Sequence, residues 1–370
     1  MAGSDEQSVA ETPVDVALCM GAEVYSRLWE VVRHLCVGLI DLAARVRLLS
    51  SSPEVEELSL GPIQTITHQG LVWPLRRKRL QQVLDMLAPR PPGVVHAISA
   101  DSFAVAEGIA RAYDVQLLLH LTSWADVAAL ANVDGQKVDH VIAGSRPLFE
   151  AAERQGRVDP EALTLIRPGV LRPAAPPSFG QPECVPAVLC TAELREHGGV
   201  DRLIRAVRIL RDRGRELLLF LLGTGPDEGE LRRLARGTGV ADWVTFARPK
   251  ADKSQIMSGA DVFVEPSVAE ALSSTSLQAM ASGTVVVACA GGVTDHCIDG
   301  RTAIVCPDNA PTALADGIER LLADHDYARR LAAAGIEHIQ EHHLVSTMAE
   351  QCMLLYRRLD LRHRTFSLEE

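Results

Sequence analysis

Two side chains in this sequence occupy positions suited to chemistry on a bound ligand: Glu270 and His120. Glu270 is the charged residue of a turn, 267–272, that follows a short apolar run at 261–264. A carboxylate in an apolar turn needs a polar partner, and a ligand can supply one. His120 ends an apolar run in the first half of the chain, where an imidazole can exchange hydrogen bonds near neutral pH. A lone histidine is also common as a structural or surface residue, so both interpretations of His120 stay open.

Four hydroxyl-bearing residues follow Glu270 and offer N-cap chemistry. They are Ser273, Ser274, Thr275 and Ser276, just before helical spacing begins at 277–281. The amide groups at the start of such a helix have no intrahelical acceptor and favour an anion such as a phosphate. In open α/β sheets, ligands bind in the crevice at the carboxyl ends of the strands. The sequence of this turn therefore predicts that the connection between the strand and the helix binds a ligand.

The elements that must position these residues alternate between strand and helix in both halves of the chain. This order predicts an α/β fold with two doubly wound, Rossmann-like domains. Strands are expected at 14–20, 46–50, 63–67, 94–98, 115–120, 138–143, 162–166, 187–191, 217–222, 243–246 and 261–264, with one more in the block ending at 307. Helices are expected at 23–44, 77–87, 102–113, 147–155, 199–213, 228–237, 253–259, 277–281, 311–323, 327–342 and 345–361.

A breaker-rich stretch divides the chain into two domains. Residues 173–182 are rich in proline and are expected to be the linker. The N-terminal domain is then 1–172 and the C-terminal domain 183–344, with a last amphipathic stretch within 345–370.

The block 261–307 carries a pattern of small and apolar residues that resembles a known family. The matching residues are Pro266, Ser267, Glu270, Ala279, Met280, Ala281, Gly283, Val286, Val287, Gly291 and Gly292. They fall in register with the C-terminal signature of the retaining GT-B glycosyltransferases of family 4. The resemblance implies two domains facing across a cleft, with the last helix, about 345–370, returning to the N-terminal domain.

The resemblance also implies the activity. A family 4 enzyme moves a sugar from a UDP- or GDP-linked nucleotide-sugar donor to a hydroxyl of a glycan, lipid or small molecule, with retention and without metal or other cofactor. On this basis His120 and Glu270 are the catalytic residues at the donor sugar. The amides of Ser273 to Ser276 lie at the diphosphate, Gly21 lies in the first loop of the donor site, and Gln278 stands where the family has a second glutamate.

The match fails at the residues that grip the diphosphate. Glu193 stands where the family has arginine, and Gly198 where it has lysine. A carboxylate about 4 Å from a phosphate costs a few kcal/mol, on the order of a catalytic contribution. Arg195, Arg202 and Lys250 are the cations placed to compensate.

These departures leave two functional hypotheses open. One is an active glycosyltransferase. The alternative is a catalytically inactive pseudo-glycosyltransferase that serves as a binding or scaffold subunit for a partner protein. Gly223 and Gly225 match a family turn, G-x-G-P, that supports the fold more than the activity.

Composition limits the partners and the location. The net charge of −11 and the pI near 5.6 argue against a nucleic-acid partner, which calls for a basic surface. The polar, acidic start at 1–12 does not resemble a signal peptide, and the eight cysteines lack metal or redox spacing, so a cytoplasmic protein is expected.

One basic cluster points to a peripheral contact with the inner face of a membrane. Its residues are Trp73, Arg76, Arg77, Lys78 and Arg79. Basic residues beside an aromatic ring attract anionic lipid headgroups. The alternative is an ordinary solvated helix start.

Overall fold

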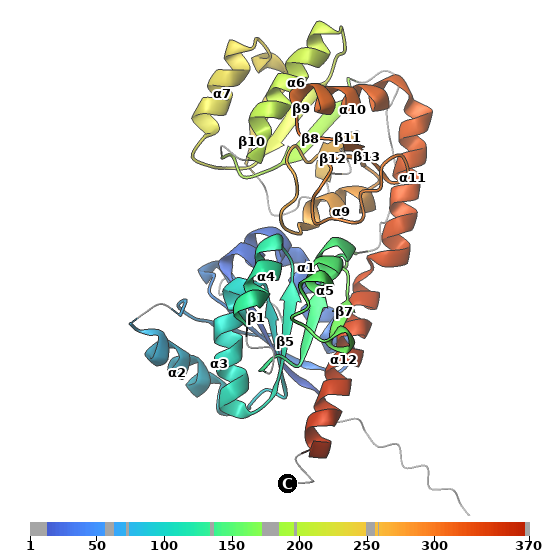
Figure 1. The fold of residues 1–370 in the computed structure, drawn as a ribbon. Helices are drawn as coiled ribbons and strands as arrows, with labels where there is room; N and C mark the ends of the chain where they lie inside the picture. Colours follow the sequence, from blue (N-terminus) through green and yellow to red (C-terminus); the bar gives the residue numbers. More distant parts are fainter. Residues whose placement is uncertain are drawn as a thin grey trace, which may run out of the picture.

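The fold consists of two parallel sheets, each with helices packed against it. The structure is a computed structural model that describes residues 13–55, 63–71, 74–133, 137–171, 185–195, 198–248, 256–257 and 259–366, with side chains up to 360. The first sheet has seven strands in the order β3-β2-β1-β4-β5-β6-β7, and the second has six in the order β10-β9-β8-β11-β12-β13. Figure 1 shows the two domains stacked one above the other. This arrangement confirms the predicted GT-B architecture of two Rossmann-like domains.

The elements follow the predicted order closely, except that the block ending at 307 contains two further strands where one was expected. In the first domain they are β1 (Asp15–Met20), α1 (Ala22–Asp41), β2 (Arg45–Ser50), β3 (Gln64–Thr67), α2 (Arg76–Leu87), β4 (Val94–Ile98), α3 (Phe103–Tyr113), β5 (Gln116–Leu121), α4 (Trp124–Ala129), β6 (His140–Ala143), α5 (Arg146–Gln155) and β7 (Leu163–Leu165). In the second they are β8 (Ala187–Thr191), α6 (Val200–Asp212), β9 (Leu218–Leu222), α7 (Glu228–Gly237), β10 (Val244–Ala247), β11 (Val262–Val264), α9 (Ser274–Ala281), β12 (Val285–Cys289), β13 (Ala303–Cys306), α10 (Pro311–Ala323) and α11 (His325–His342).

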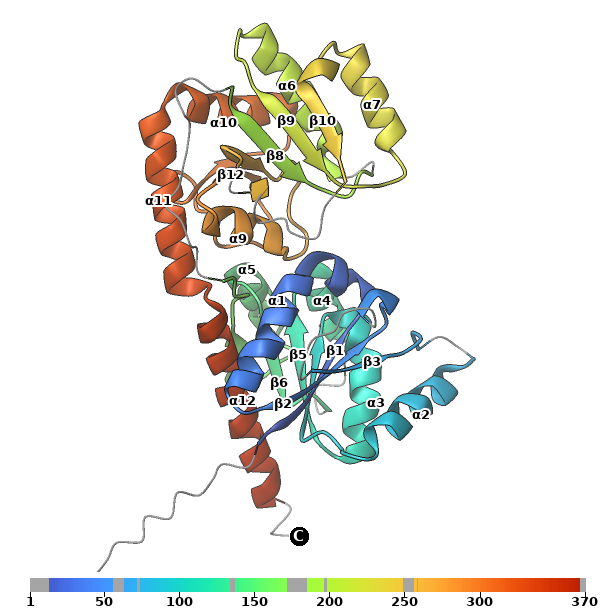
Figure 2. The same ribbon diagram turned by 180° about the vertical axis from the view of Figure 1, so that it is seen from behind.

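The last helix, α12 (Val345–Phe366), leaves the second domain and packs on the first, as the family resemblance implies. Figure 2 shows α11 and α12 running along one side of the molecule, past both domains. Tyr356 and Leu359 of α12 are buried in the core of the N-terminal domain. Gly38 of α1 lets the two helices approach, because a Cβ there would lie 2.7 Å from the Cβ of Ala349.

Two predicted features lie mostly or wholly outside the described residues: the linker 173–182 and the helix 253–259. The domain boundaries at 172 and 183 therefore stay predictions. One helix, α4, was not predicted. It has six residues and one buried side chain, so it lacks the long apolar periodicity that marks a helix in sequence.

No helix in the described part of the chain combines the length and the apolar character that crossing a bilayer requires.

Candidate functional site

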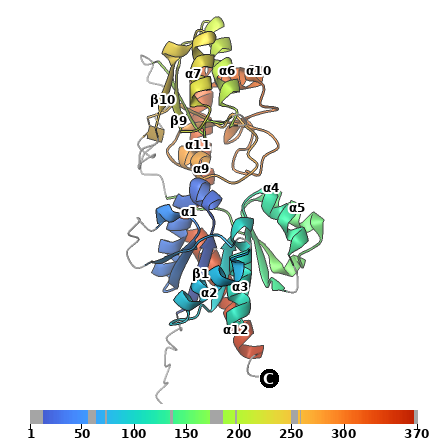
Figure 3. The ribbon, with the colours of Figure 1, turned by 90° about the vertical axis from the view of Figure 1, so that its left-hand side faces the viewer.

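The loops that carry the predicted site residues meet where the two sheets face each other. Gly21 follows β1, and His120 lies near the carboxyl end of β5. Across the gap, residues 265–273 connect β11 to the start of α9. Figure 3 shows α9 directly opposite α1. Glu270 and His120 are thus brought to the same interdomain region, as predicted from strand order.

A short stretch of the C-terminal domain, residues 270–274, forms hydrogen bonds with the N-terminal domain; we call it the interdomain segment. The backbone N–H of Trp124 donates to the carbonyl of Glu270 at 3.1 Å, and the N–H of Leu272 donates to the carbonyl of Thr122 at 2.7 Å. Ser123 and Ala271 form an antiparallel bridge between these two bonds. The two domains are therefore joined by main-chain pairing at the predicted site.

Side chains reinforce this contact. Leu272 is 3% exposed and belongs to the apolar core of the N-terminal domain. Arg27 of α1 donates from Nη1 to the carbonyl of Leu272 at 2.7 Å. In return, the Ser274 hydroxyl donates to the carbonyl of Arg27 at 3.3 Å. The side chain of Glu270 contributes to none of these bonds, and the residue is exposed. Its carboxylate is left available to a ligand.

The start of α9 has the predicted cap. Ser273 is the N-cap, and its hydroxyl accepts from the N–H of Thr275 at 3.3 Å. Ser276 is fully buried, and its hydroxyl bonds to Nε2 of His296 at 2.9 Å. This hydroxyl therefore points into its own domain. Gln278 lies two residues further along α9 and is half-buried. The roles of these residues at a diphosphate or ribose remain predictions.

His120 is the next-to-last residue of β5 and is 8% exposed. Its ring stacks on that of His96, with centroids 5.4 Å apart and planes 10° from parallel. Burial lowers the pKa of His120 to about 4, although the charge of Asp126 opposes the shift. The imidazole is therefore neutral near pH 7. Within the described contacts, its Nδ1 is shielded from solvent and has no hydrogen-bond partner.

His96, by contrast, has a structural role. It is fully buried, and its Nδ1 bonds to the hydroxyl of Tyr356 on α12 at 2.6 Å. This bond ties the last helix to the sheet that carries His120.

A buried carboxylate, Asp126, organises the N-terminal side of the site and was missed from sequence. One oxygen, Oδ1, accepts from the hydroxyl of Ser99 at 2.7 Å and from the N–H of Ala100 at 2.6 Å. The other oxygen accepts from the N–H and the hydroxyl of Thr122 at 2.7 and 2.9 Å. Asp126 thus holds together the loops after β4 and β5. The signal in the sequence was its place three residues after Ser123, the N-cap of α4, as in a capping box.

Gly21 is required at the first loop for a steric reason. A Cβ at this position would lie 1.7 Å from Oδ2 of Asp101. Burial is the main cause that raises the pKa of Asp101 to about 6, and the charges of Glu23 and Asp126 add to it. Asp101, Glu23 and Asp126 together make this part of the site acidic.

The loop predicted to lie at the diphosphate, which we call the diphosphate loop, is described at residues 193–195 and 198, and it carries its own ion pair. Arg195 donates from Nη2 to Oε1 of Glu193, and the two side chains are 60% and 54% exposed. The N–H of Gly198 donates to the carbonyl of Arg195 at 2.9 Å. A Cβ at Gly198 would lie 2.8 Å from the carbonyl oxygen of Glu193, so a lysine there would force the loop to shift. Lys250 falls outside the described residues.

The two glycines of the G-x-G-P turn pack against the backbone at the start of this loop. A Cβ at Gly223 would lie 1.9 Å from the carbonyl oxygen of Ala192, and one at Gly225 would lie 2.3 Å from that of Leu194. Both glycines let two backbones pack closely, which accords with the sequence interpretation that they support the fold.

Glu265, at the end of β11, is a second carboxylate that sequence reasoning did not single out. Burial raises its pKa, while a hydrogen bond from Ser276 acts in the opposite direction. Its Oε2 is buried and has no partner in the described contacts. A lone glutamate beside a proline gave no signal in sequence.

Comparison with known proteins places the second domain in a family. Residues 185–324 match the family described as glycosyl transferases group 1. The second domain is a glycosyl transferases group 1 domain. This assignment confirms the resemblance that the block 261–307 carried.

Curated relatives extend the match beyond this glycosyl transferases group 1 domain. An alpha-maltose-1-phosphate synthase of Mycolicibacterium smegmatis is 29% identical over 72% of the chain and 74% of its own length. A D-inositol 3-phosphate glycosyltransferase of Stackebrandtia nassauensis is 29% identical over 68% of the chain and 60% of its own length. A GDP-mannose-dependent mannosyltransferase acting on phosphatidylinositol monomannoside, also from M. smegmatis, is 35% identical over 41% of each chain. The match thus spans less than two thirds of the second and third relatives.

The fold has solved counterparts as well. A glycosyltransferase from Rickettsia africae superposes with a TM-score of 0.79, covering 94% of this chain and 99% of that one at 15% identity. The glycosyl transferases group 1 domain is therefore set in a GT-B architecture that includes both domains.

Proposed function

We propose that this protein is a retaining glycosyltransferase that moves a hexose from a UDP- or GDP-linked donor to a hydroxyl of a glycan, lipid or small molecule. The observation that carries the proposal is the interdomain segment. It places the free carboxylate of Glu270 and the start of α9 against the strand ends that carry His120. The relatives named as nucleotide-sugar enzymes support the same reaction class.

The positive end of α9 suits a donor that carries a diphosphate. As the bond between the anomeric carbon and the diphosphate oxygen breaks, negative charge grows on the diphosphate. The amide groups at the start of α9 stabilise that charge without reorganising. The acceptor oxygen forms the new bond to the anomeric carbon on the same face and loses its proton to the departing diphosphate.

Glu270 and His120 have complementary tasks in this proposal. The carboxylate of Glu270 accepts hydrogen bonds from sugar hydroxyls. The imidazole of His120, with its pKa lowered to about 4, stays neutral and exchanges a hydrogen bond with the sugar without adding charge. Arg195 supplies a cation to the diphosphate when it turns away from Glu193.

The alternative, a pseudo-glycosyltransferase that binds a partner protein, is favoured by one observation. The Glu193–Arg195 pair leaves the diphosphate loop without the net positive charge that the family has there.

Calorimetric titration separates the two functions. The purified protein is titrated with UDP, GDP, ADP and their common sugar conjugates. A dissociation constant in the micromolar range, about −8 kcal/mol, supports a working donor site and names the base. Absence of binding at millimolar nucleotide contradicts the enzyme and favours the scaffold.

We also propose a peripheral membrane contact through the start of α2. Arg76, Arg77 and Lys78 are exposed there, beside Leu75, which is 47% exposed. Arg79 instead donates to the carbonyl of Gly70, and Trp73 lies outside the described residues.

Co-sedimentation with vesicles tests this contact. Binding to vesicles with anionic lipid is expected to fall with salt and to be lost when Arg76, Arg77 and Lys78 are changed to glutamine. Equal binding to neutral vesicles would contradict it.

A further inference from the structure

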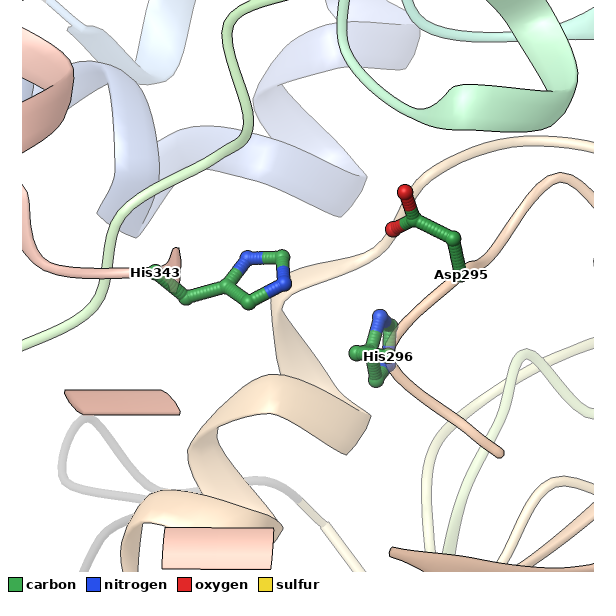
Figure 4. A group of neighbouring side chains, drawn as sticks. All are labelled: Asp295, His296 and His343. Atoms are coloured by element: carbon green, nitrogen blue, oxygen red, sulfur yellow. The ribbon is translucent and has the colours of Figure 1, made fainter. Parts of the chain in front are cut away.

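A cluster of potential metal ligands lies where the chain crosses between the domains. Asp295 and His296 belong to the loop between β12 and β13, and His343 follows α11. One donor atom from each lies within 4.8 Å of the other two. Figure 4 shows the His343 ring extending toward Asp295 and His296. Two segments far apart in sequence thus converge on one point.

The hydrogen bonds of His343 leave one ring nitrogen free to bind a metal. Nδ1 lies 3.0 Å from the carbonyl oxygen of Pro168, and a carbonyl can only accept, so Nδ1 carries the proton. The other nitrogen, Nε2, then presents a lone pair. It is buried without a partner in the described contacts, in a residue that is 1% exposed. Metal-binding histidines are typically held this way by a backbone carbonyl on the second nitrogen.

His296 is oriented by a similar relay. The hydroxyl of Ser276 donates to Glu265 and lies 2.9 Å from Nε2 of His296. Since that hydroxyl has one hydrogen, it accepts from the Nε2–H of His296. The remaining nitrogen, Nδ1, is left with its lone pair.

Asp295 also has an oxygen to spare. Its Oδ2 accepts from the N–H of Arg146 at 2.9 Å and from Nε of Arg167 at 3.0 Å. The ion pair of Arg167 through Nη2, at 2.9 Å, uses the same oxygen. Oδ1 is therefore the available donor, and Arg167 holds the carboxylate in place.

We propose that Asp295, His296 and His343 form a site for one divalent transition-metal ion of the zinc type. Two neutral imidazoles and one carboxylate are the donors that zinc takes, usually in a tetrahedral arrangement with water at the fourth position. Calcium and magnesium, which need several oxygen ligands, suit this set poorly because one carboxylate is already paired with arginine. Donors around such an ion lie about 3.4 Å apart, so the side chains close inward on binding.

The consequence of an ion here is mechanical. Residues 168–170 and 343–345, the crossing segments, run side by side. Val170 accepts from the N–H of Val345 at 3.3 Å, and its own N–H donates to the carbonyl of His343 at 2.8 Å. The ion fixes the crossing segments to the β12–β13 loop and restricts domain opening. The inference does not depend on the transfer reaction.

Zinc titration of chelator-treated protein tests the proposal. We expect one zinc ion per wild-type chain by competition with a chelating dye. Affinity should weaken about 100-fold or more in His343→Gln and His296→Gln, since loss of a supporting bond alone costs 10- to 100-fold. His325→Gln, on the other end of α11 about 27 Å away, is the matched control and should keep full affinity.

A second variant tests the nearest competing site. His338 and His342 lie one turn apart on α11, with ring centroids 4.7 Å apart. If His342→Gln abolishes binding while His343→Gln keeps it, the ion sits on that helical pair and the proposal is wrong.

A measurement on the wild type covers the case in which variants fail to fold. Cobalt added to the chelator-treated protein should give the strong visible absorption of a four-coordinate ion, and equimolar zinc should remove it. A weak, six-coordinate spectrum or no stoichiometric binding would overturn the proposal.

Discussion

The two stretches that the family pattern assigns to the donor are built in opposite ways. In the diphosphate loop the two charged side chains, Glu193 and Arg195, pair with each other at the surface and are more than half exposed, while the buried Leu194 between them anchors the backbone. The interdomain segment is held by main-chain bonds and by Leu272, which is 3% exposed in the core of the other domain. In the stretch that lost the family's charges, the exposed side chains of Glu193 and Arg195 can change without disturbing the core. The stretch that kept its glutamate also holds the domains together.

The sharpest test of this comparison is Glu270→Ala. We expect the turnover number to fall about 100- to 1,000-fold, because a transition-state hydrogen-bond partner is removed. The melting temperature should stay unchanged, since the segment is anchored through the backbone of residue 270. Initial rates with the donor found by titration give the answer, and Glu230→Ala on α7 is the control. Undiminished turnover would remove Glu270 from the site.

A smaller effect is expected from Arg27→Met, which leaves the carbonyl of Leu272 without its charged donor. Such a bond contributes about 1.5–3 kcal/mol, so kcat/KM should fall about 10- to 100-fold if closure is needed for transfer. Arg33→Met on the same helix, where the guanidinium pairs with Glu30 instead, is the control. Equal rates in both variants would show that closure does not limit transfer.

Glu193→Gln tests the diphosphate loop and should improve binding. Removing the carboxylate frees Arg195 and ends the repulsion of the donor, so nucleotide affinity should rise about 3- to 10-fold at low salt. Calorimetry of the variant beside Glu230→Gln measures the gain. Weaker binding would mean that Glu193 positions Arg195 usefully. A lysine at Gly198 is a poor companion change because of the close carbonyl of Glu193.

The smallest effect concerns pH. The pKa of Asp101 is raised to about 6 from 3.8, so its ionisation disfavours the folded state, and stability is lost as pH rises between these values. Asp101→Asn should raise the melting temperature by about 1–2 °C at pH 8. The gain is small because the residue as a whole is exposed, although neighbouring groups shield its carboxyl group, so solvent screens part of the effect. The gain should be smaller at pH 5. A gain that is equal at both pH values would exclude the carboxyl group as its cause.

Much of the fold could be predicted from the sequence because its strands are short, apolar and bounded by breakers. Runs such as 94–98 and 187–191 have the same bounds in the structure. The positions of Glu270 and His120 followed from the rule that parallel strands end at one edge. The pairing of Ser123 with Ala271 could not be predicted, since backbone bonds leave no residue code. The meeting of His296 and His343 could not be predicted either, since it depends on how the loop between β12 and β13 folds against the end of α11.

The placement of α12 has a consequence for the order in which the molecule forms. Tyr356 is among the largest fully buried side chains, and it lies in the core of the domain that is synthesised first. While the ribosome is still making the second half, the first domain lacks the helix α12 that packs against its core, and His96 lacks its hydroxyl partner. Domains commonly fold as they emerge, N-terminal first. Here the second domain can complete its core of strands and helices before the first has received its last helix.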